Sequence, residues 1–279
     1  MNGPRLVVDD ISVIRVGTPR PVLNQISLTF SSHELVAICG HNGAGKTTFA
    51  RTLLGLCPVA KGTISLNGRP VHRAGQRQIQ MVFQPPSAQL IGQTIFEELA
   101  ITALQSNPAL TRSQLEQFVQ DCALRVGLLA PIHADVHALS GGELQRLCVA
   151  QALASDARVL VLDEALSSLD PATRTSLRHQ LRDLTVTHGM TVLMITHDME
   201  DVLSADRVVV LDRGEVRLDA VPRDFFYDGA GQTSPCSSLG FHPPYLVEAA
   251  ITANQKWGTS LNPLTEEQFV EELSHVPVP

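Results

Sequence analysis

Several features that would mark a secreted, metal-binding or nucleic-acid-binding protein are missing from this chain. Its five cysteines form no CxxC pair, and its ten histidines show no spacing typical of metal ligands. Acidic residues number 28 against 21 basic ones, so the chain lacks the basic excess of a general nucleic-acid binder. This balance still allows a local basic patch, but we expect no nucleic-acid partner. We expect buried thiols in a reducing compartment at Cys39, Cys57, Cys122, Cys148 and Cys236.

Long apolar runs are missing too. No stretch is apolar for long enough to cross a bilayer, and the N-terminus lacks the charged region and apolar run of a signal peptide. Apolar residues still make up 44% of the 279, enough for a sizeable core in one large domain or two small ones. We therefore expect a soluble, cytoplasmic protein that acts on a membrane only through a partner.

Strand and helix signals follow one another in an order typical of an α/β fold. Residues 34–40, 158–164 and 191–197 are continuous apolar runs, as in parallel strands that are covered on both faces. The antiparallel signals are strands over residues 6–16 and 22–30, a hairpin around Asn67 and Gly68 within residues 62–71, and a closing hairpin over residues 207–219. Between these β-rich parts, residues 90–153 have helical character, which predicts a helical insertion in the α/β core.

Three local signals complete this outline. Thr111 and Gln114 have capping-box spacing at the start of a helix over residues 111–129. Its predicted buried face consists of Leu115, Phe118, Val119, Cys122, Ala123 and Val126. Thr265 and Gln268 repeat the capping-box spacing near the C-terminus. Residues 229–240 are small and polar, which predicts a linker before a short C-terminal appendix.

The segment GHNGAGKT fits the phosphate-loop pattern GxxxxGK[ST] and lies between a predicted strand and a predicted helix. Glycines let backbone N–H groups converge on phosphate oxygens, and the helix N-terminus adds a favourable dipole. Lys46 is predicted to bridge the β- and γ-phosphates, and the Thr47 hydroxyl to ligate Mg²⁺. The expected nucleotide contacts here are Gly40, His41, Asn42, Gly43, Ala44, Gly45, Lys46, Thr47 and Thr48.

Two acids, Asp163 and Glu164, end the apolar run VLVLDE. Two acids after a strand can simply be a solvated strand end. Beside a phosphate loop, however, they lie where open α/β sheets place ligand chemistry. We predict that Asp163 holds Mg²⁺ and that Glu164 orients and deprotonates the attacking water.

The segment LSGGELQR offers a second helix N-terminus, with Ser140, Gly141 and Gly142 ahead of Glu143. It can be an ordinary serine N-cap, or a second anion site. One nucleotide does not need two such sites from one chain. A second anion site would therefore imply that another copy or a close paralogue sandwiches the γ-phosphate.

GHNGAGKT, Gln84, LSGGELQR, VLVLDE, SSLD and ITHD follow one another in an order that resembles the nucleotide-binding subunit of an ABC transporter, over about residues 6–219. The resemblance implies a mostly parallel, RecA-like P-loop core with an N-terminal antiparallel β subdomain and a helical signature subdomain. It implies a head-to-tail dimer around ATP and Mg²⁺. Gln84 would lie near Mg²⁺ and the attacking water, Asp170 at the interface, and His197 at the γ-phosphate. Ser140, Gly141, Gly142 and Glu143 would act in trans.

The stretch FQPPSAQLIGQTIFEEL resembles the ATPases of energy-coupling factors, which take up cobalt, nickel and vitamins, and so does the tail NPLTEEQFVEEL. This resemblance implies an importer of a vitamin or transition metal ion. Its partners would be a membrane-embedded T-component and a substrate-binding membrane subunit, with the ATPase peripheral on the cytoplasmic face. Residues 89–99 would line the groove for the T-component. We expect an ATPase domain over residues 1–232, with the helical insertion near residues 90–153, and an extension over residues 233–279.

Five positions depart from the family pattern. Arg15 stands where an aromatic residue usually stacks on adenine, a role that a planar guanidinium can take over. His33 replaces a glycine, Ala165 replaces a proline, and Ser87-Ala88 replaces an acidic pair. None of these changes removes a phosphate-binding or water-activating residue, so we expect an active ATPase.

Alternatives remain. The chain could serve another type of ABC transporter, act as a soluble ABC ATPase on ribosomes or DNA, or be a regulatory subunit without hydrolysis. A single cassette without a heptad run argues against the second, and Glu164 and His197 against the third. The transported substrate and the choice between homodimer and paralogue pair are not readable from this chain.

Overall fold

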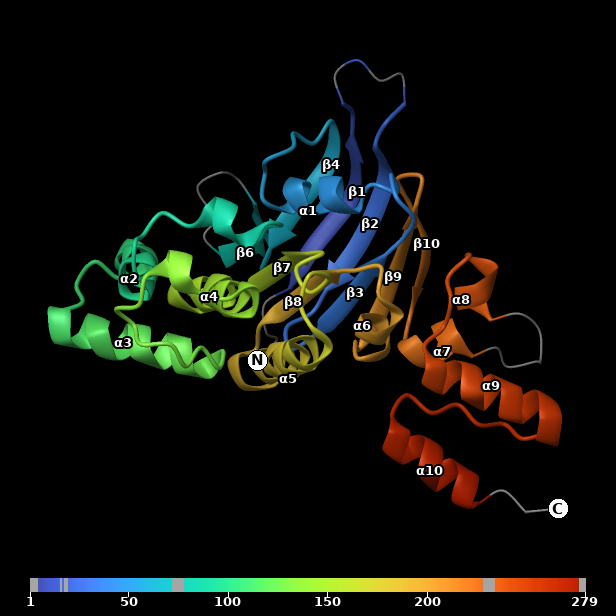
Figure 1. Ribbon diagram of the computed structural model, residues 1–279. Helices are drawn as coiled ribbons and strands as arrows, with labels where there is room; N and C mark the ends of the chain where they lie inside the picture. The colour runs from blue at the N-terminus through green and yellow to red at the C-terminus, as the bar shows by residue number, and fades with distance from the viewer. Residues whose placement is uncertain (1–4, 16, 18–19, 72–77, 228–233, 276–279) are drawn as a thin grey trace.

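The computed structural model describes residues 5–15, 17, 20–71, 78–227 and 234–275. Within these residues, two β-sheets form the centre and helices cover them (Figure 1). The strands are β1 (Leu6–Val13), β2 (Leu23–Phe30), β3 (Leu35–Cys39), β4 (Lys61–Leu66), β5 (Arg69–Pro70), β6 (Ile79–Val82), β7 (Val159–Asp163), β8 (Thr191–Ile195), β9 (Arg207–Asp212) and β10 (Glu215–Ala220). The helices are α1 (Lys46–Leu53), α2 (Ile95–Ser106), α3 (Arg112–Arg125), α4 (Gly141–Ala154), α5 (Pro171–His188), α6 (Met199–Leu203), α7 (Pro222–Phe226), α8 (Pro235–Ser238), α9 (Tyr245–Trp257) and α10 (Glu266–Ser274), with 3₁₀ turns η2 (Pro86–Gln89) and η3 (Val136–Ala138).

The larger sheet has six strands in the order β10-β9-β3-β8-β7-β6. All neighbours from β9 to β6 pair in parallel, and β10 closes the edge as an antiparallel hairpin with β9. Strands β3 and β8 are buried along their whole length, because both faces of the sheet are covered. The predicted continuous apolar runs are therefore central strands. Their carboxyl ends lie at one edge, where Asp163 pairs with Ile195 in register.

The smaller sheet is antiparallel, with four strands in the order β2-β1-β4-β5. Its buried residues share one apolar cluster with α1 and with one face of the larger sheet, and the rings of Phe30 and Phe49 lie 6.4 Å apart. The predicted hairpin turn is present: Asn67 and Gly68 both have positive φ, 55° and 74°, as a tight two-residue turn requires. The strand predicted over residues 6–16 ends at Val13, and Val16 lies outside the described residues.

The helical insertion lies between β6 and β7, as predicted. Helices α2, α3 and α4 pack on one another and join the apolar cluster on the other face of the larger sheet. The predicted face of α3 is confirmed, with Leu115, Val119, Cys122, Ala123 and Val126 buried and Phe118 half-buried. The predicted capping box is also present, because Thr111 and Gln114 exchange hydrogen bonds at the start of α3.

Other local predictions were wrong. Part of the expected linker is helix α8, whose Cys236 is fully buried, whereas residues 229–233 lie outside the described residues. Only half of the second capping box forms, because the Gln268 side chain accepts from the N–H of Leu264 and not from that of Thr265. Cys57 is half-buried, unlike the other four cysteines.

The stretch after Gln84 forms a short turn and then enters the core. Strand β6 ends at Val82, before the prolines, and Pro86–Gln89 forms a 3₁₀ turn. Of the residues expected to line a partner groove, Ile95 and Leu99 are fully buried in the core, so only part of that stretch can meet a partner. Among the described residues, no helix combines the length and apolarity needed to cross a membrane.

Candidate functional site

The carboxyl edge of the larger sheet gathers the predicted phosphate-binding and water-activating residues. The phosphate loop follows β3, Asp163 ends β7 with Glu164 directly after it, and His197 follows β8. These three strands are neighbours in the sheet, so their ends meet at one place. The arrangement explains how segments more than a hundred residues apart in sequence contribute to a single site.

The phosphate loop has a backbone that only glycine accommodates at key positions. Gly40, Gly43 and Gly45 have φ values of 152°, 80° and 103°. A Cβ on Gly40 would also lie 2.2 Å from the carbonyl oxygen of Leu211, which no side chain could tolerate. Lys46 is buried, and its ammonium donates to the carbonyl oxygens of Gly40 at 2.7 Å and His41 at 3.2 Å. The loop therefore places a positive charge and the N-terminus of α1 together, which suits an anionic ligand.

Thr47 and Asp163 bring two oxygen atoms together beside this loop. The Thr47 hydroxyl donates to Asp163 Oδ1 at 3.3 Å. Burial raises the pKa of the Asp163 carboxyl, and the neighbouring Glu164 adds to the rise, while the Thr47 hydrogen bond opposes it. A hard divalent cation prefers oxygen ligands and would offset the cost of this half-buried carboxylate. These residues therefore fit a Mg²⁺ ion.

Glu164 and His197 face each other across the same edge. Glu164 Oε1 lies 3.9 Å from His197 Nδ1, and both side chains are partly exposed. Glu164 has a φ of 52°, a left-handed conformation that is rare for a non-glycine residue, and its N–H donates to the carbonyl of Ile195. Such strain is typical of residues that a fold holds for function.

Gln84 reaches this group through Ser167. Its side-chain amide donates to Ser167 Oγ at 3.2 Å, and the Ser167 hydroxyl donates to the Glu164 carbonyl at 2.7 Å. The exposed Gln84 side chain is thus joined to the backbone of Glu164 by a single intervening hydroxyl. The structure therefore links Gln84 to Glu164 through Ser167. The predicted role of Gln84 near Mg²⁺ and the attacking water remains a prediction.

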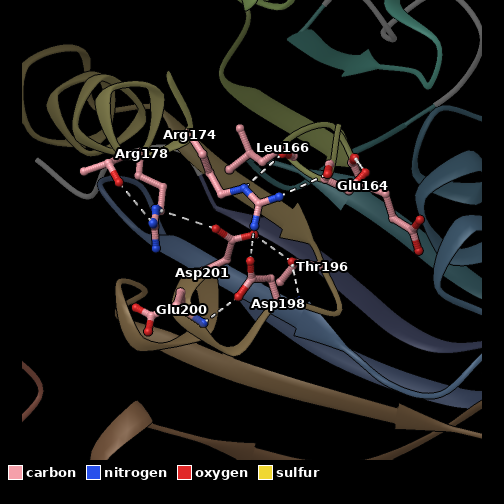
Figure 2. Close-up of polar contacts among 10 residues, drawn as sticks. Glu164, Leu166, Arg174, Arg178, Thr196, Asp198, Glu200 and Asp201 are labelled. Atoms are coloured by element: carbon pink, nitrogen blue, oxygen red, sulfur yellow. Dashed lines mark hydrogen bonds and ion pairs between the residues drawn. The ribbon is translucent and has the colours of Figure 1, made fainter. Parts of the chain in front are cut away.

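Arg174 of α5 ties the segment after Glu164 to the segment after His197 (Figure 2). Its guanidinium donates to the carbonyl oxygens of Leu166 at 3.1 Å and Ser167 at 3.0 Å, and it also forms an ion pair with Asp198. Asp198 follows His197 directly and caps α6. The two segments that carry the acid and the histidine are therefore joined by one side chain.

Arg178 and Asp201 form a second pair of opposite charges near the contacts of Arg174. Arg178 Nε is 3.7 Å from Asp201 Oδ1, too far for a hydrogen bond, and that oxygen has none among the described residues. The other oxygen of Asp201 accepts from the Thr196 hydroxyl at 2.7 Å (Figure 2). Burial raises the pKa of Asp201, with Thr196 opposing the rise.

The second helix N-terminus, at α4, forms a capping box. Ser140 accepts from the Glu143 N–H, and Glu143 accepts from both the N–H and the hydroxyl of Ser140. These hydrogen bonds lower the pKa of Glu143. The ordinary N-cap is thus present, and a role as an anion site remains a prediction.

The two glycines of this segment differ in their surroundings. A Cβ on Gly142 would lie 2.7 Å from a methyl group of Thr173, whereas one on Gly141 would meet nothing within 4 Å. Contacts within the described chain therefore account for the glycine at position 142 and not for the one at 141.

The remaining predicted residues lie apart from this edge or serve local structure. Asp170 caps α5 by accepting from the N–H of Thr173, and this bond holds its pKa below the usual value. Thr48 lies in the first turn of α1, where its carbonyl accepts from the Thr52 hydroxyl. Arg15 is exposed just after β1.

Sequence reasoning missed Ser167 and Arg174. Ser167 lies in the quoted motif SSLD, but its link between Gln84 and Glu164 depends on tertiary contact. Arg174 follows Asp170 by one helical turn, so its position on the first turn of α5 was readable, although its partners across the fold were not.

Comparisons with known proteins agree on one family. The sequence profile of the ABC transporter family matches residues 23–167. The energy-coupling factor transporter ATP-binding protein EcfA1 of Latilactobacillus sakei subsp. sakei (strain 23K) is 37% identical over 262 residues, which cover 91% of this chain and 90% of the relative. EcfA1 of Geobacillus kaustophilus (strain HTA426) is 33% identical over 98% of both chains. Among solved structures, cbiO1 of Clostridium perfringens, part of the ABC transporter complex cbiONQ, has a TM-score of 0.75 at 23% identity and covers 96% of this chain and 98% of its own.

Proposed function

Because this chain belongs to the ABC transporter family and, within it, to the ATP-binding proteins of energy-coupling factor transporters, we propose that Lys46, Glu164 and His197 carry its ATP hydrolysis. Its fold is the P-loop fold of ABC ATPases. The observation that carries the assignment is the meeting of the phosphate loop with Glu164 and His197 at one sheet edge, where the two side chains lie 3.9 Å apart.

The phosphate loop would bind ATP through its backbone N–H groups and the Lys46 ammonium, which now donates to two loop carbonyls. Glu164 would orient the attacking water and take its proton, and His197 would contact the γ-phosphate. Ser167 and Gln84 would keep Glu164 in position beside the attacking water. Gln84 donates to the Ser167 hydroxyl, which donates to the Glu164 carbonyl.

Thr47, Asp163 and Gln84 are the residues that would hold Mg²⁺. When bound, the ion would neutralise charge on the transferring phosphate. The half-buried carboxyl of Asp163 and the Thr47 hydroxyl, 3.3 Å apart, would supply hard oxygen ligands to one ion. Arg15 would stack on the adenine base through its planar guanidinium.

The second half of each nucleotide site would come from another ATPase subunit, through Ser140, Gly141, Gly142 and Glu143 in trans and Asp170 at the interface. The surroundings of Gly141 support this, because no contact among the described residues explains the missing side chain. Closing and opening of this dimer would then be the two-state element that ATP binding and hydrolysis bias. The partner could be an identical copy or a paralogue.

The dimer would drive uptake of a vitamin or a transition metal ion through a T-component-like membrane subunit and a substrate-binding membrane subunit. The ATPase would lie peripherally on the cytoplasmic face. Ile91, which is 80% exposed, suits contact with a membrane partner. Gln89, beside it, accepts from the Phe83 N–H, so this surface connects to the loop that carries Gln84.

We also propose that residues 1–232 form the ATPase domain, that residues 90–153 are its helical insertion, and that residues 233–279 form the extension.

Replacing Glu164 tests the catalytic assignment. Glu164→Gln should lower ATP turnover about a hundredfold or more, as loss of a general base does, while leaving ATP binding intact. Phosphate release and nucleotide titration on the full chain measure the two effects. Glu116→Gln, the same exchange in an exposed ion pair on α3, is the matched control and should hydrolyse ATP normally. Normal turnover by Glu164→Gln would exclude Glu164 as the base.

A further inference from the structure

The phosphate loop is in direct contact with the C-terminal extension. His41 Nε2 lies 2.8 Å from the carbonyl oxygen of Leu239, and because a carbonyl only accepts, this nitrogen carries the proton and donates. The imidazole also stacks on the ring of Phe241, with centroids 4.9 Å apart and planes only 6° apart. A side chain inside the nucleotide-binding motif is thus held by a segment that follows the ATPase core.

The extension holds Phe241 firmly. The Phe241 ring packs 6.2 Å from that of Phe225, which is fully buried in α7, and the Phe241 N–H donates to the carbonyl of Cys236. Cys236 is itself fully buried in α8. Gly240 makes the turn between them at a φ of 82°. The ring that meets His41 is therefore half-buried and packs against the apolar core.

His41 is also part of the charge cradle of the loop. Its carbonyl oxygen accepts from the Lys46 ammonium at 3.2 Å and from the Ala44 N–H at 3.1 Å. The glycines on either side of this stretch give the loop backbone much freedom. The contacts with Leu239 and Phe241 fix the His41 side chain. They therefore restrict the backbone of the residue whose carbonyl accepts from Lys46. A loop restricted in this way loses less conformational entropy when it closes around phosphates.

We propose that residues 239–241 of the extension belong to the nucleotide site, and that Phe241 is a positioning residue that orders the phosphate loop through His41. This inference rests on the proposed ATPase function. Loss of the stacking weakens ATP binding. It leaves the chemical step largely unchanged, because Glu164 and His197 come from other strands.

Phe241→Leu keeps an apolar side chain but removes the flat ring. Steady-state ATP hydrolysis by the full chain should show KM for ATP raised about three- to tenfold, the scale of one lost aromatic pair, with kcat within about twofold of the parent. Phe241→Tyr restores a ring and should restore KM. Phe269→Leu makes the same exchange in α10, where the ring packs on a separate cluster, and should leave KM unchanged.

His41→Ala removes the contact from the loop side and leaves the packing of the extension in place, so it tests the inference even if Phe241→Leu folds poorly. His41→Ala should raise KM to a similar extent, and the double variant should be no worse than the more affected single one. The inference would be overturned if the increases in KM of the two single variants multiplied in the double variant. It would also be overturned if Phe241→Leu had the melting temperature and the KM for ATP of the parent. A parent chain that does not hydrolyse ATP would overturn the proposed function as well.

Discussion

His33 adopts a backbone conformation that glycine reaches at lower cost. Its φ is 63°, in the left-handed region, and its ring lies over Gly189, where an added Cβ would come within 3.1 Å of it. The position is the one where the family pattern has glycine, so the structure explains that preference by backbone conformation. Glu164 has a similar φ of 52°, but its side chain has a proposed catalytic role, and no comparable role explains His33.

His33→Gly should raise the free energy of unfolding by about 1 kcal/mol, because it relieves the left-handed strain of a residue with a Cβ. Urea denaturation of the full chain measures the change. His33→Ala is the control, since alanine loses the imidazole but keeps the Cβ. If His33→Gly were no more stable than His33→Ala, the backbone argument would be wrong.

For single residues, the sequence predicts a place in the site only where the residue belongs to a local motif. Gly40, Lys46 and Asp163 lie in short motifs beside recognisable strands, so their meeting at one sheet edge follows from parallel topology. The contact between His41 and Phe241 joins residues that are two hundred positions apart. No periodicity or motif spacing records such a contact.

Between elements, Arg174 joins the start of α5 to the segment after β8. It reaches two carbonyls after Glu164 and the carboxylate of Asp198, which follows His197. The guanidinium fork suits this triple contact, which a lysine ammonium cannot reproduce with the same geometry. We expect the contacts of Arg174 to hold Glu164 and His197 in a fixed position relative to each other.

Arg174→Lys should therefore lower kcat about tenfold or more, on the scale of a misplaced catalytic group, with little change in KM for ATP. Steady-state hydrolysis separates the two constants. Arg112→Lys makes the same exchange in an exposed pair on α3 and should behave like the parent. A change in KM alone would place Arg174 in nucleotide binding and not in alignment.

Helices were predicted correctly where a buried face repeats along the sequence. The prediction failed where a small, polar composition suggested a linker. The apolar face of α3 was readable because a 3.6-residue repeat buries it. The small polar residues before α8 resemble a linker, yet Ser234 caps a short helix there and Cys236 is fully buried in the core. A single buried residue in a four-residue helix leaves no periodic signal.

For the whole molecule, the decisive question is whether the nucleotide site is complete in one chain. In the proposed site, Lys46, Asp163, Glu164 and His197 would lie on one side of the nucleotide. The glycine at 141 has no explanation within the described residues, because an added Cβ there meets nothing. A nucleotide held by another subunit would supply the missing neighbour. Blocking that approach should disrupt association without harming the fold.

Glu164→Gln should form an ATP-dependent dimer, because bound ATP is no longer hydrolysed and the closed state persists. Adding Gly141→Asp should abolish this dimer, since it places a side chain and a negative charge against the γ-phosphate. The melting temperature should stay close to that of the parent, because the side chain enters open space. Sedimentation with ATP and Mg²⁺ measures association. Ser113→Asp, which puts the same charge on the exposed first turn of α3, should still dimerise. Dimerisation of the Gly141→Asp variant would show that this helix N-terminus does not meet the nucleotide of another subunit.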